Sequence, residues 1–265
     1  MRSAGVAPVD DSVVRADGEL IRFDIEGDRH GTRNGWLVLH SSPAFAVFGS
    51  WKTGARGTWS RHDDISPADR ARIGADIDRA KAARRDQKLR EQHAAQIRAQ
   101  RMWDEAAVAD PAHAYLVAKA ISTHGVRQAG DLLLVPMRES DGRLWAIQTI
   151  TPAGDKRFLR GSRKRGLYCA IGGCVGETLL VAEGFATAAS VHEATGYPAA
   201  CAFDAGNLEP VAIALRAKYP TARIVICADD DRATADRIGV NPGIEAATRA
   251  ARAVHGAIAL PEFDA

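Results

Sequence analysis

The sequence predicts an α/β protein with a C-terminal parallel sheet and flanking helices. Before this sheet we expect an α+β basic subdomain, a long helix and a small β-rich N-terminal module. Three observations predict this class. After residue 177, short apolar runs alternate with helical segments. No glycine or proline occurs in 75–109, and tryptophan and glycine are frequent in the first 60 residues. These changes predict four parts, at 1–62, 63–109, 110–176 and 177–265.

The overall composition is that of a globular protein, with 46% hydrophobic and 26% charged residues among 265. It excludes collagen-like, disulfide-scaffold and wholly disordered chains. The four cysteines never form a CxxC pair, so we expect neither a zinc ribbon nor a redox pair. No run of about 18 apolar residues occurs, and the N-terminus lacks the apolar stretch of a secretion signal. We therefore expect no membrane partner and a cytoplasmic location.

The N-terminal part has the pattern of short strands followed by one long helix. Strands are predicted at 20–25, 36–40, 46–48 and 57–59, and the pair Asn34-Gly35 favours a tight hairpin turn. Ser66 and Pro67 then have the residue types of a helix cap and a first helical position. A helix, or a helix pair, is expected from there to Ala109. Its polar composition leaves two interpretations open, a solvated spacer or a helix that follows nucleic acid.

The segment after Asp110-Pro111 combines strands with a basic run. A short helix is predicted at 112–119, and two strands at 132–136 and 144–150 with a turn between them. Between residues 154 and 168 Asp155 is the single acid, and the cations are Lys156, Arg157, Arg160, Arg163, Lys164 and Arg165. Such a run is either a solvated surface loop or a surface that binds phosphates. The excess of cations beside a cluster of acids favours phosphate binding.

The last ninety residues alternate regularly between apolar runs and helical segments. The predicted strands lie at 178–182, 199–203, 223–228 and 257–260. The predicted helices lie at 185–194, 208–219 and 242–254. Asn207 and Asn241 precede two of these helices and are expected to cap them. Near-continuous apolar strands with intervening helices are typical of a parallel sheet that is covered on both faces.

Carboxylates follow three of these strands. Glu183-Gly184 follows the first strand, Asp204 the second, and three aspartates at 229–231 the third. Because parallel strands end at one edge of a sheet, these side chains should gather there, and a cation would offset their repulsion. Oxygen ligands without histidine or thiolate suit Mg²⁺ or Mn²⁺. In extended chain, Asp229 and Asp231 point the same way. The competing interpretation is that these acids only cap the following helices.

The segments LLVAEGFATAAS and IVICADDDR resemble the Toprim domain, which bacterial-type primases, topoisomerases and certain nucleases share. That family has an apolar strand ending in Glu-Gly and a later strand ending in Asp-x-Asp. The resemblance implies that Glu183 acts as an acid/base or metal-organising residue and that Asp229 and Asp231 are metal ligands. Asp204 has no equally firm role in the family and stays an additional candidate for the acidic site.

The preceding segment is similar to plasmid- and phage-type primases. Gly142-Arg143 and then Lys156-Arg157-Phe158 match the order found in bacterial replicative primases, where a basic step precedes the Toprim module. Two departures suggest a catalytic core without accessory modules. No paired cysteines for a zinc-binding module precede the core, and the run GSRKRG lacks the Gly-Lys-Ser/Thr ending of a helicase motor. Residues 20–60 also resemble the leader region of mobile-element primases.

The resemblance implies a DNA primase that uses Mg²⁺ (or Mn²⁺) for nucleotidyl transfer. It would make short primers from nucleoside triphosphates on a single-stranded DNA template, with a separate replicative helicase as a further partner. The residues implied in nucleotide or template binding are Arg143, Lys156, Arg157, Arg160, Arg163 and Lys164. Two alternatives remain. A Toprim-type nuclease would use the same metals to activate water, and a non-catalytic accessory protein of a mobile element would only bind nucleic acid.

Overall fold

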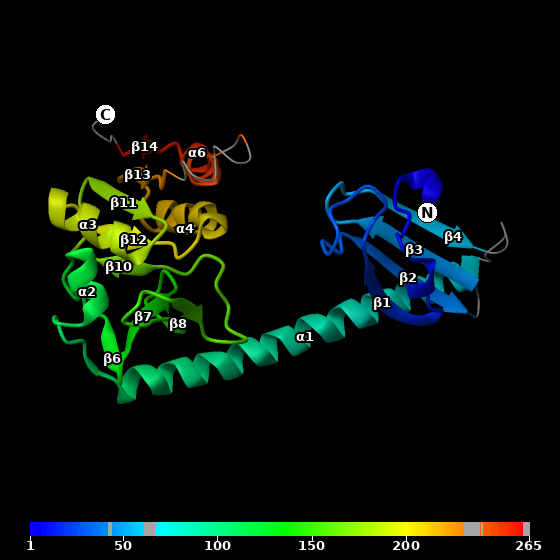
Figure 1. Ribbon diagram of the computed structural model, residues 1–265, viewed down its shortest axis with the longest axis horizontal. Coiled ribbons are helices and arrows are strands. Elements are labelled where there is room, and N and C mark those ends of the chain that lie inside the picture. The colour runs from blue at the N-terminus through cyan, green and yellow to red at the C-terminus, as the bar shows by residue number, and fades with distance from the viewer. Residues whose placement is uncertain (42–43, 61–66, 231–238, 240, 262–265) are drawn as a thin grey trace. The chain divides into compact units, whose positions relative to one another are not determined.

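The computed structural model describes residues 1–41, 44–60, 67–230, 239 and 241–261 (Figure 1). The chain divides into two compact units, Met1–Arg84 and Arg85–Ala265, and the boundary lies within helix α1 (Pro67–Glu105). The predicted cap Ser66 lies outside the described residues, and the four-part division of the chain stays a prediction. None of the described helices combines the length and the apolar character that a membrane crossing requires.

The first unit contains a four-stranded antiparallel sheet in the order β1-β2-β3-β4. Its strands are β1 (Asp17–Phe23), β2 (Gly35–Ser41), β3 (Ala44–Ser50) and β4 (Arg56–Ser60). Two one-turn 3-10 helices precede them, at Arg2–Ala4 and Asp11–Val13. The core of this unit lies on one face of the sheet, around Phe23, Leu37 and Phe48. The predicted β-rich module is thus confirmed.

The prediction of a tight hairpin turn at Asn34-Gly35 is wrong. Residues 24–34 form a longer connection, and Gly35 is the first residue of β2, paired with Phe23. A Cβ atom at Gly35 would lie 2.3 Å from the Phe23 ring. The glycine is therefore required by close packing between two strands and not by a turn. The connection itself is held by Asp24, whose carboxylate accepts hydrogen bonds from the amides of Gly31 and Arg33, both at 2.7 Å.

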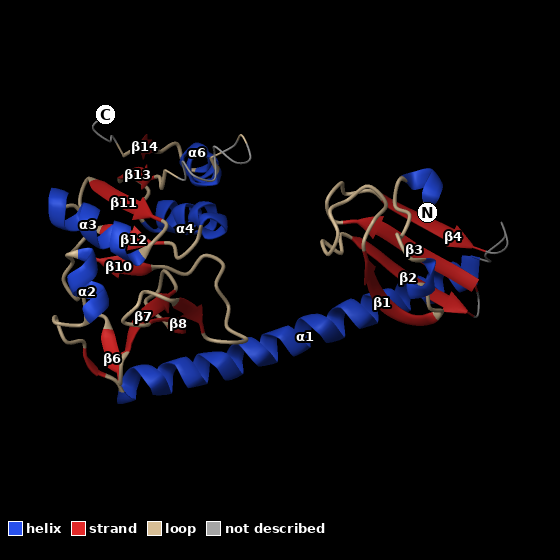
Figure 2. Ribbon diagram, in the orientation of Figure 1, coloured by secondary structure: helices blue, strands red, loops and turns tan. Residues whose placement is uncertain are grey.

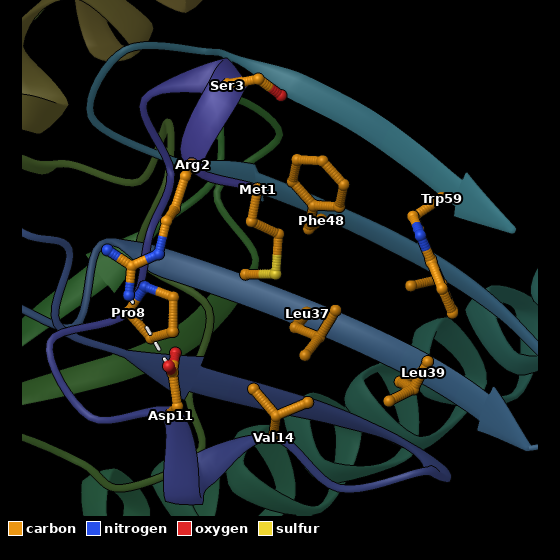
Figure 3. A pocket seen from close by; sticks show the side chains of 11 residues that line it. Met1, Arg2, Ser3, Pro8, Asp11, Val14, Leu37, Leu39, Phe48 and Trp59 are labelled. Atoms are coloured by element: carbon orange, nitrogen blue, oxygen red, sulfur yellow. Dashed lines mark ion pairs between the residues drawn. The ribbon is translucent and has the colours of Figure 1, made fainter. Parts of the chain in front are cut away.

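The core face of this sheet is hollowed into an apolar pocket of about 530 Å³ (Figure 3). Leu37, Phe48 and Trp59 line it from the strands, and residues of the N-terminal segment, among them Met1 and Val14, line its other side. An ion pair between Arg2 and Asp11, at 3.6 Å, lies at the same pocket. Although it lines the pocket, Trp59 is 49% exposed.

The second unit begins with a five-stranded antiparallel sheet in the order β5-β6-β7-β8-β9. Its elements are β5 (Ala107–Val108), α2 (Ala114–Lys119), β6 (Arg127–Ala129), β7 (Leu132–Arg138), β8 (Leu144–Ile150) and β9 (Lys156–Phe158). The last turns of α1 cover β7 and β8: Ala95 and Ala99 are fully buried, and Gln96 Nε2 donates to the Leu144 carbonyl at 3.1 Å. This half of α1 is therefore part of a core, and the solvated-spacer interpretation does not hold for it. The helix ends at Glu105, earlier than predicted.

The C-terminal sheet has the order β10-β12-β11-β13-β14. Its strands are β10 (Cys169–Ile171), β11 (Thr178–Ala182), β12 (Ala199–Cys201), β13 (Arg223–Cys227) and β14 (Ala257–Ala259). Strands β11 to β14 are parallel, and β10 runs antiparallel to β12. Among the described residues, the helices that flank the sheet are α3 (Phe185–Thr195), α4 (Ala205–Lys218) and α6 (Pro242–Ala253) (Figure 2). The fold class predicted from the sequence is confirmed.

Alternate residues of β11 enter two different cores. Leu180 and Ala182 pack with α3 and with the antiparallel sheet, so the two sheets of this unit share one core. Leu179 and Val181 face the other way and pack with α4 and α6. Burial on both faces explains why this strand is apolar throughout, as expected for a central parallel strand. It also places the carboxyl end of β11 at a fixed point between the helices.

Candidate active site

The carboxyl ends of three neighbouring parallel strands meet at one edge of the C-terminal sheet. In the strand register, Ala182 at the end of β11 is paired with Cys201 of β12 and with Cys227 of β13. Glu183 therefore follows the central strand, while Asp204 and Asp229 follow the strands on either side. Their gathering at one edge is what parallel pairing dictates, and their roles stay a proposal.

The first turn of α3 joins the ends of β11 and β13. Gly184 precedes the helix in extended conformation, and Thr187 Oγ1 donates a long hydrogen bond, 3.5 Å, to Asp229 Oδ1. A Cβ atom at Gly184 would lie 3.8 Å from Nζ of Lys156. The Lys156 ammonium therefore lies beside the start of α3, next to Glu183. A lysine and the positive end of a helix dipole thus lie at the strand edge that carries Glu183 and Asp229, an arrangement suited to a phosphate that carries a cation.

Asp229 and Asp230 contact different helices. Asp229 contacts Thr187 of α3, whereas Asp230 Oδ1 accepts a hydrogen bond from Asn241 Nδ2 at 2.8 Å. Asn241 in turn caps α6, because its Oδ1 accepts from the Ile244 amide at 3.2 Å, which confirms the predicted cap. Asp230 thus helps to fix the start of α6. This alternation agrees with the extended geometry on which the Asp-x-Asp prediction depends.

The third predicted ligand, Asp231, lies outside the described residues. Within the described part of the chain, no three histidine, cysteine, aspartate or glutamate side chains stand close enough together to hold a metal ion. Glu183 and Asp229 are the two described members of the predicted ligand set.

Two buried cysteines, Cys201 and Cys227, lie directly beneath this edge and add no metal ligand to it. Burial, with a smaller contribution from Asp229, raises the pKa of Cys227 to about 11. Burial also raises the pKa of Cys201 well above its usual value, and its thiol donates to the Glu183 carbonyl at 3.4 Å. Both thiols therefore stay protonated at neutral pH and are poor metal ligands. The available donors are carboxylate oxygens, which fit a hard divalent cation.

Asp204, at the end of β12, is bound to the basic run. Its Oδ2 forms an ion pair with Lys164 Nζ. The same ammonium lies 4.8 Å from the centre of the Phe158 ring, and that ring meets Phe203 edge to face at 6.3 Å. Phe203 has a φ of 74°, a strained value for a residue with a side chain, and it directly precedes Asp204. The end of β12 is thus occupied by contacts with the antiparallel sheet.

The sequence predicts that Asn207 caps a helix, and the structure shows that this prediction is wrong. Helix α4 begins at Ala205, so Asn207 lies inside its first turn and does not cap it. The side chain is 2% exposed, accepts from the Gly166 amide at 2.7 Å, and donates to the carbonyls of Leu167 and Ala202 at 3.0 and 2.8 Å. These three bonds fasten the basic loop to the end of β12. An asparagine shortly after an apolar strand has the sequence appearance of a cap, and no local signal distinguishes the two roles.

Two predicted nucleotide-binding arginines make their described contacts within the antiparallel sheet. Arg163 forms an ion pair with Glu139 at 2.7 Å and lies 4.2 Å from the centre of the Trp145 ring. Arg143 lies in the turn between β7 and β8 and faces Asp141 of that turn at 3.6 Å. The contact of Arg163 fixes the basic loop to the sheet, and Arg143 is mostly exposed.

The remaining cations lie on β9 and in the loop that follows it, and they point in different directions. Lys156 and Phe158 share one face of this strand, and Arg157 points to the other. Arg157 and Arg160 are exposed, and the Arg160 carbonyl accepts a hydrogen bond from Arg98 of α1 at 2.8 Å. The described structure therefore brings two of the six predicted cations, Lys156 and Lys164, to the carboxylate edge.

Comparison with known proteins identifies related sequences. Residues 178–261 match the family model of the Toprim domain. The chain is 35% identical over 257 residues to a DNA primase TraC of Escherichia coli, covering 93% of this chain and 24% of that protein. A second DNA primase TraC of Escherichia coli is 35% identical over 278 residues, covering 99% of this chain and 19% of that protein. The chain thus spans about a quarter of the length of the first relative and about a fifth of the length of the second.

Comparison with solved structures gives partial matches. The primase fragment of the bacteriophage T7 primase-helicase protein superposes with a TM-score of 0.42 and 14% identity, over 56% of this chain and 64% of that one. The DnaG catalytic core superposes with a TM-score of 0.39 and 14% identity, over 62% and 67% of the two chains.

Proposed function

We propose that this chain, which carries a Toprim domain at residues 178–261 and is homologous to the DNA primase TraC over nearly its whole length, is the catalytic core of a DNA primase. The reaction is nucleotidyl transfer that makes short primers from nucleoside triphosphates on single-stranded DNA. The observation that supports this proposal is that Glu183 and Asp229 follow the ends of two paired parallel strands, with the Lys156 ammonium beside Gly184 at the same edge. A Toprim domain fits a divalent metal, and the oxygen donors favour Mg²⁺ or Mn²⁺.

The proposed ligand set consists of Glu183, Asp229 and Asp231. A bound divalent cation would supply the positive charge that a triphosphate and an ionising 3′-hydroxyl require. Thr187 positions Asp229 through its hydroxyl, and Lys156 neutralises phosphate charge beside the start of α3. Lys164, positioned by Asp204, adds a second positive charge from the basic loop. Glu183, on the central strand, is the proposed acid/base or metal-organising residue.

The other predicted cations have proposed roles in template binding. Arg157 and Arg160 are exposed on the basic segment and would contact phosphates of the single-stranded template. Arg143 would act in the same way from the β7–β8 turn. Arg163 would act mainly by fixing the loop through Glu139 and Trp145. A separate replicative helicase as partner, and a cytoplasmic location, follow from the proposed function as further predictions.

The proposal is tested by incubating the chain with single-stranded DNA, labelled nucleoside triphosphates and either Mg²⁺ or Mn²⁺. Labelled oligonucleotides whose appearance requires the template are the expected product. Shortened DNA, formed without added nucleotides, would replace the proposal with the nuclease alternative. A folded protein that binds DNA but gives neither product would indicate the accessory role.

A further inference from the structure

The charge distribution of the N-terminal module is strongly uneven along the sequence. Residues 29–60 contain no aspartate or glutamate, and the acids of this module all lie at or before Asp28. The same segment carries three tryptophans and four lysine or arginine residues, Arg29, Arg33, Lys52 and Arg56. A basic segment rich in tryptophan is chemically suited to nucleic acid, since phosphates and bases require cations and aromatic faces.

The fold brings basic residues and Trp51 of this segment to one end of the sheet. The β1–β2 connection and the β3–β4 connection meet there: Gly35 is paired with Ser50, and the Trp51 amide donates to the Asn34 carbonyl at 2.9 Å. Arg56, at the start of β4, is paired with Gly49 at the same end. Cations that are separated in the sequence are thus collected around Trp51.

Trp51 is held in a fixed orientation although about half of it is in solvent. Its side chain is 53% exposed. The Arg22 guanidinium lies 4.8 Å from the ring centre, and Arg22 is itself held by two hydrogen bonds, at 3.1 and 2.9 Å, to the Arg33 carbonyl. The Trp36 ring lies 5.9 Å away at an angle of 42°. Trp36 packs against the backbone of Gly49, where a Cβ atom would lie 2.6 Å from its ring.

The carboxylates at this end are already engaged. Asp28 forms an ion pair with Lys52 at 2.5 Å and accepts from Asn34 Nδ2 at 3.1 Å. Asp24 accepts from two backbone amides, which lower its pKa. Within the described residues, the side chains of Arg29, Arg33 and Arg56 form no ion pair, although the charge of Arg33 contributes to the lowered pKa of Asp24. The surface around Trp51 therefore has an excess of positive charge beside an exposed and oriented indole.

We propose that the surface around Trp51, formed with Trp36, Arg22 and Arg33, binds single-stranded DNA by stacking a base on the Trp51 indole. Because Arg22 lies over one face of the indole, the base stacks on the opposite face, and the surrounding arginines bind the flanking phosphates. Stacking on aromatic side chains tolerates any base, so this site binds without sequence preference. Because Arg22 and Trp36 already fix the indole, little side-chain entropy is lost on binding. The site lies in a different unit of the chain from the carboxylate edge and does not require nucleotidyl transfer.

The first test compares two tryptophans of similar exposure. Binding of fluorescein-labelled oligo-dT to the full chain is measured by anisotropy, in EDTA and without nucleotides, over a salt series. We expect Trp51→Ala to raise the Kd about 10-fold. Trp51→Phe should retain most of the affinity. Trp59→Ala, a change in the apolar pocket of Figure 3, should alter the Kd by less than about 2-fold. Equal affinities for the wild type and Trp51→Ala would overturn the proposal.

The second test uses the unaltered protein, so it does not depend on how a variant folds. Oligo-dT with a single 5-iododeoxyuridine is photo-cross-linked to the full chain, and the modified peptide is identified by mass spectrometry. The proposal predicts a cross-link at Trp51. Cross-links confined to residues 85–265 would overturn it. Both tests omit metal and nucleotides, so a failure to synthesise primers leaves them unaffected, and their failure leaves the proposed primase activity unaffected.

Discussion

Two parts of the same sheet edge carry carboxylates within three residues of a strand end, but in different surroundings. Asp229, after β13, contacts Thr187 on the first turn of α3, and Glu183, after β11, has the Lys156 ammonium nearby. Asp204, after β12, forms an ion pair with Lys164. A carboxylate at the end of a parallel strand is therefore not a ligand by position alone. What packs against that strand end decides its role.

We propose a chemical role for the β11 and β13 ends and a positioning role for the β12 end. The β11 and β13 ends face the start of a helix and a lysine, which suits a cation and a phosphate. The β12 end is joined to the basic loop by the Lys164–Asp204 ion pair and by the three hydrogen bonds of Asn207. We therefore expect substitutions in the two regions to differ in both the size and the kind of their effects.

The largest effect is expected at the β11 and β13 ends. Glu183→Gln and Asp229→Asn should each lower primer synthesis at least ~100-fold, because each removes a negative charge from the proposed ligand set. The fold should be retained, since both substitutions keep the shape of the side chain. Primer yield and thermal unfolding are measured together. Wild-type synthesis by either variant would remove that residue from the site.

The next largest effect is expected on stability, at the β12 end. Asn207→Ala leaves the Gly166 amide and the carbonyls of Leu167 and Ala202 without their buried partner. The free energy of unfolding should fall by about 2–3 kcal/mol, as measured by urea denaturation. Trypsin should also cut faster within residues 160–165, because the loop is no longer fastened. Unchanged stability and cleavage would show that Asn207 does not hold the loop.

A smaller effect on substrate binding is expected from Lys156. Lys156→Gln should raise the apparent KM for nucleoside triphosphates by roughly 10-fold, because it removes the ammonium beside the start of α3. Arg143→Gln is the matched control, since Arg143 faces Asp141 of its own turn, and its KM should stay within about 2-fold. Equal KM values for the two variants would show that Lys156 does not contribute to triphosphate binding at this edge.

The smallest effect is expected from the Lys164–Asp204 pair. Asp204→Asn and Lys164→Gln should each lower primer synthesis by only about 3-fold, and the double variant should be no worse than either one, because both remove the same interaction. A loss with Asp204→Asn as large as with Asp229→Asn would abolish the distinction between the two regions.

The strands and the sheet edge could be predicted from sequence because their signals are local. The apolar run at 178–182 coincides with β11, and the carboxylates that follow the runs are visible without a structure. Parallel pairing then requires those carboxylates to meet. The cap at Asn241 was predictable for the same reason, since it is followed directly by proline and a helix.

The contacts of the basic loop could not be predicted, because they join segments far apart in the sequence. Asn207 bonds with Gly166, 41 residues away, and Lys164 bonds with Asp204. Nothing in the local pattern distinguishes a buried asparagine of this kind from a helix cap. Gly35 is a similar case: its sequence context indicates a turn, and packing beneath Phe23 determines its actual role.

We propose that Glu183 and Asp229, and not Asp204, hold a divalent cation. Mn²⁺ binding to the purified chain, measured by electron paramagnetic resonance, tests it directly. Glu183→Gln and Asp229→Asn should each lose the bound Mn²⁺ signal, while Asp204→Asn should keep it. Retention of wild-type Mn²⁺ affinity by both Glu183→Gln and Asp229→Asn would show that these two carboxylates do not hold the cation.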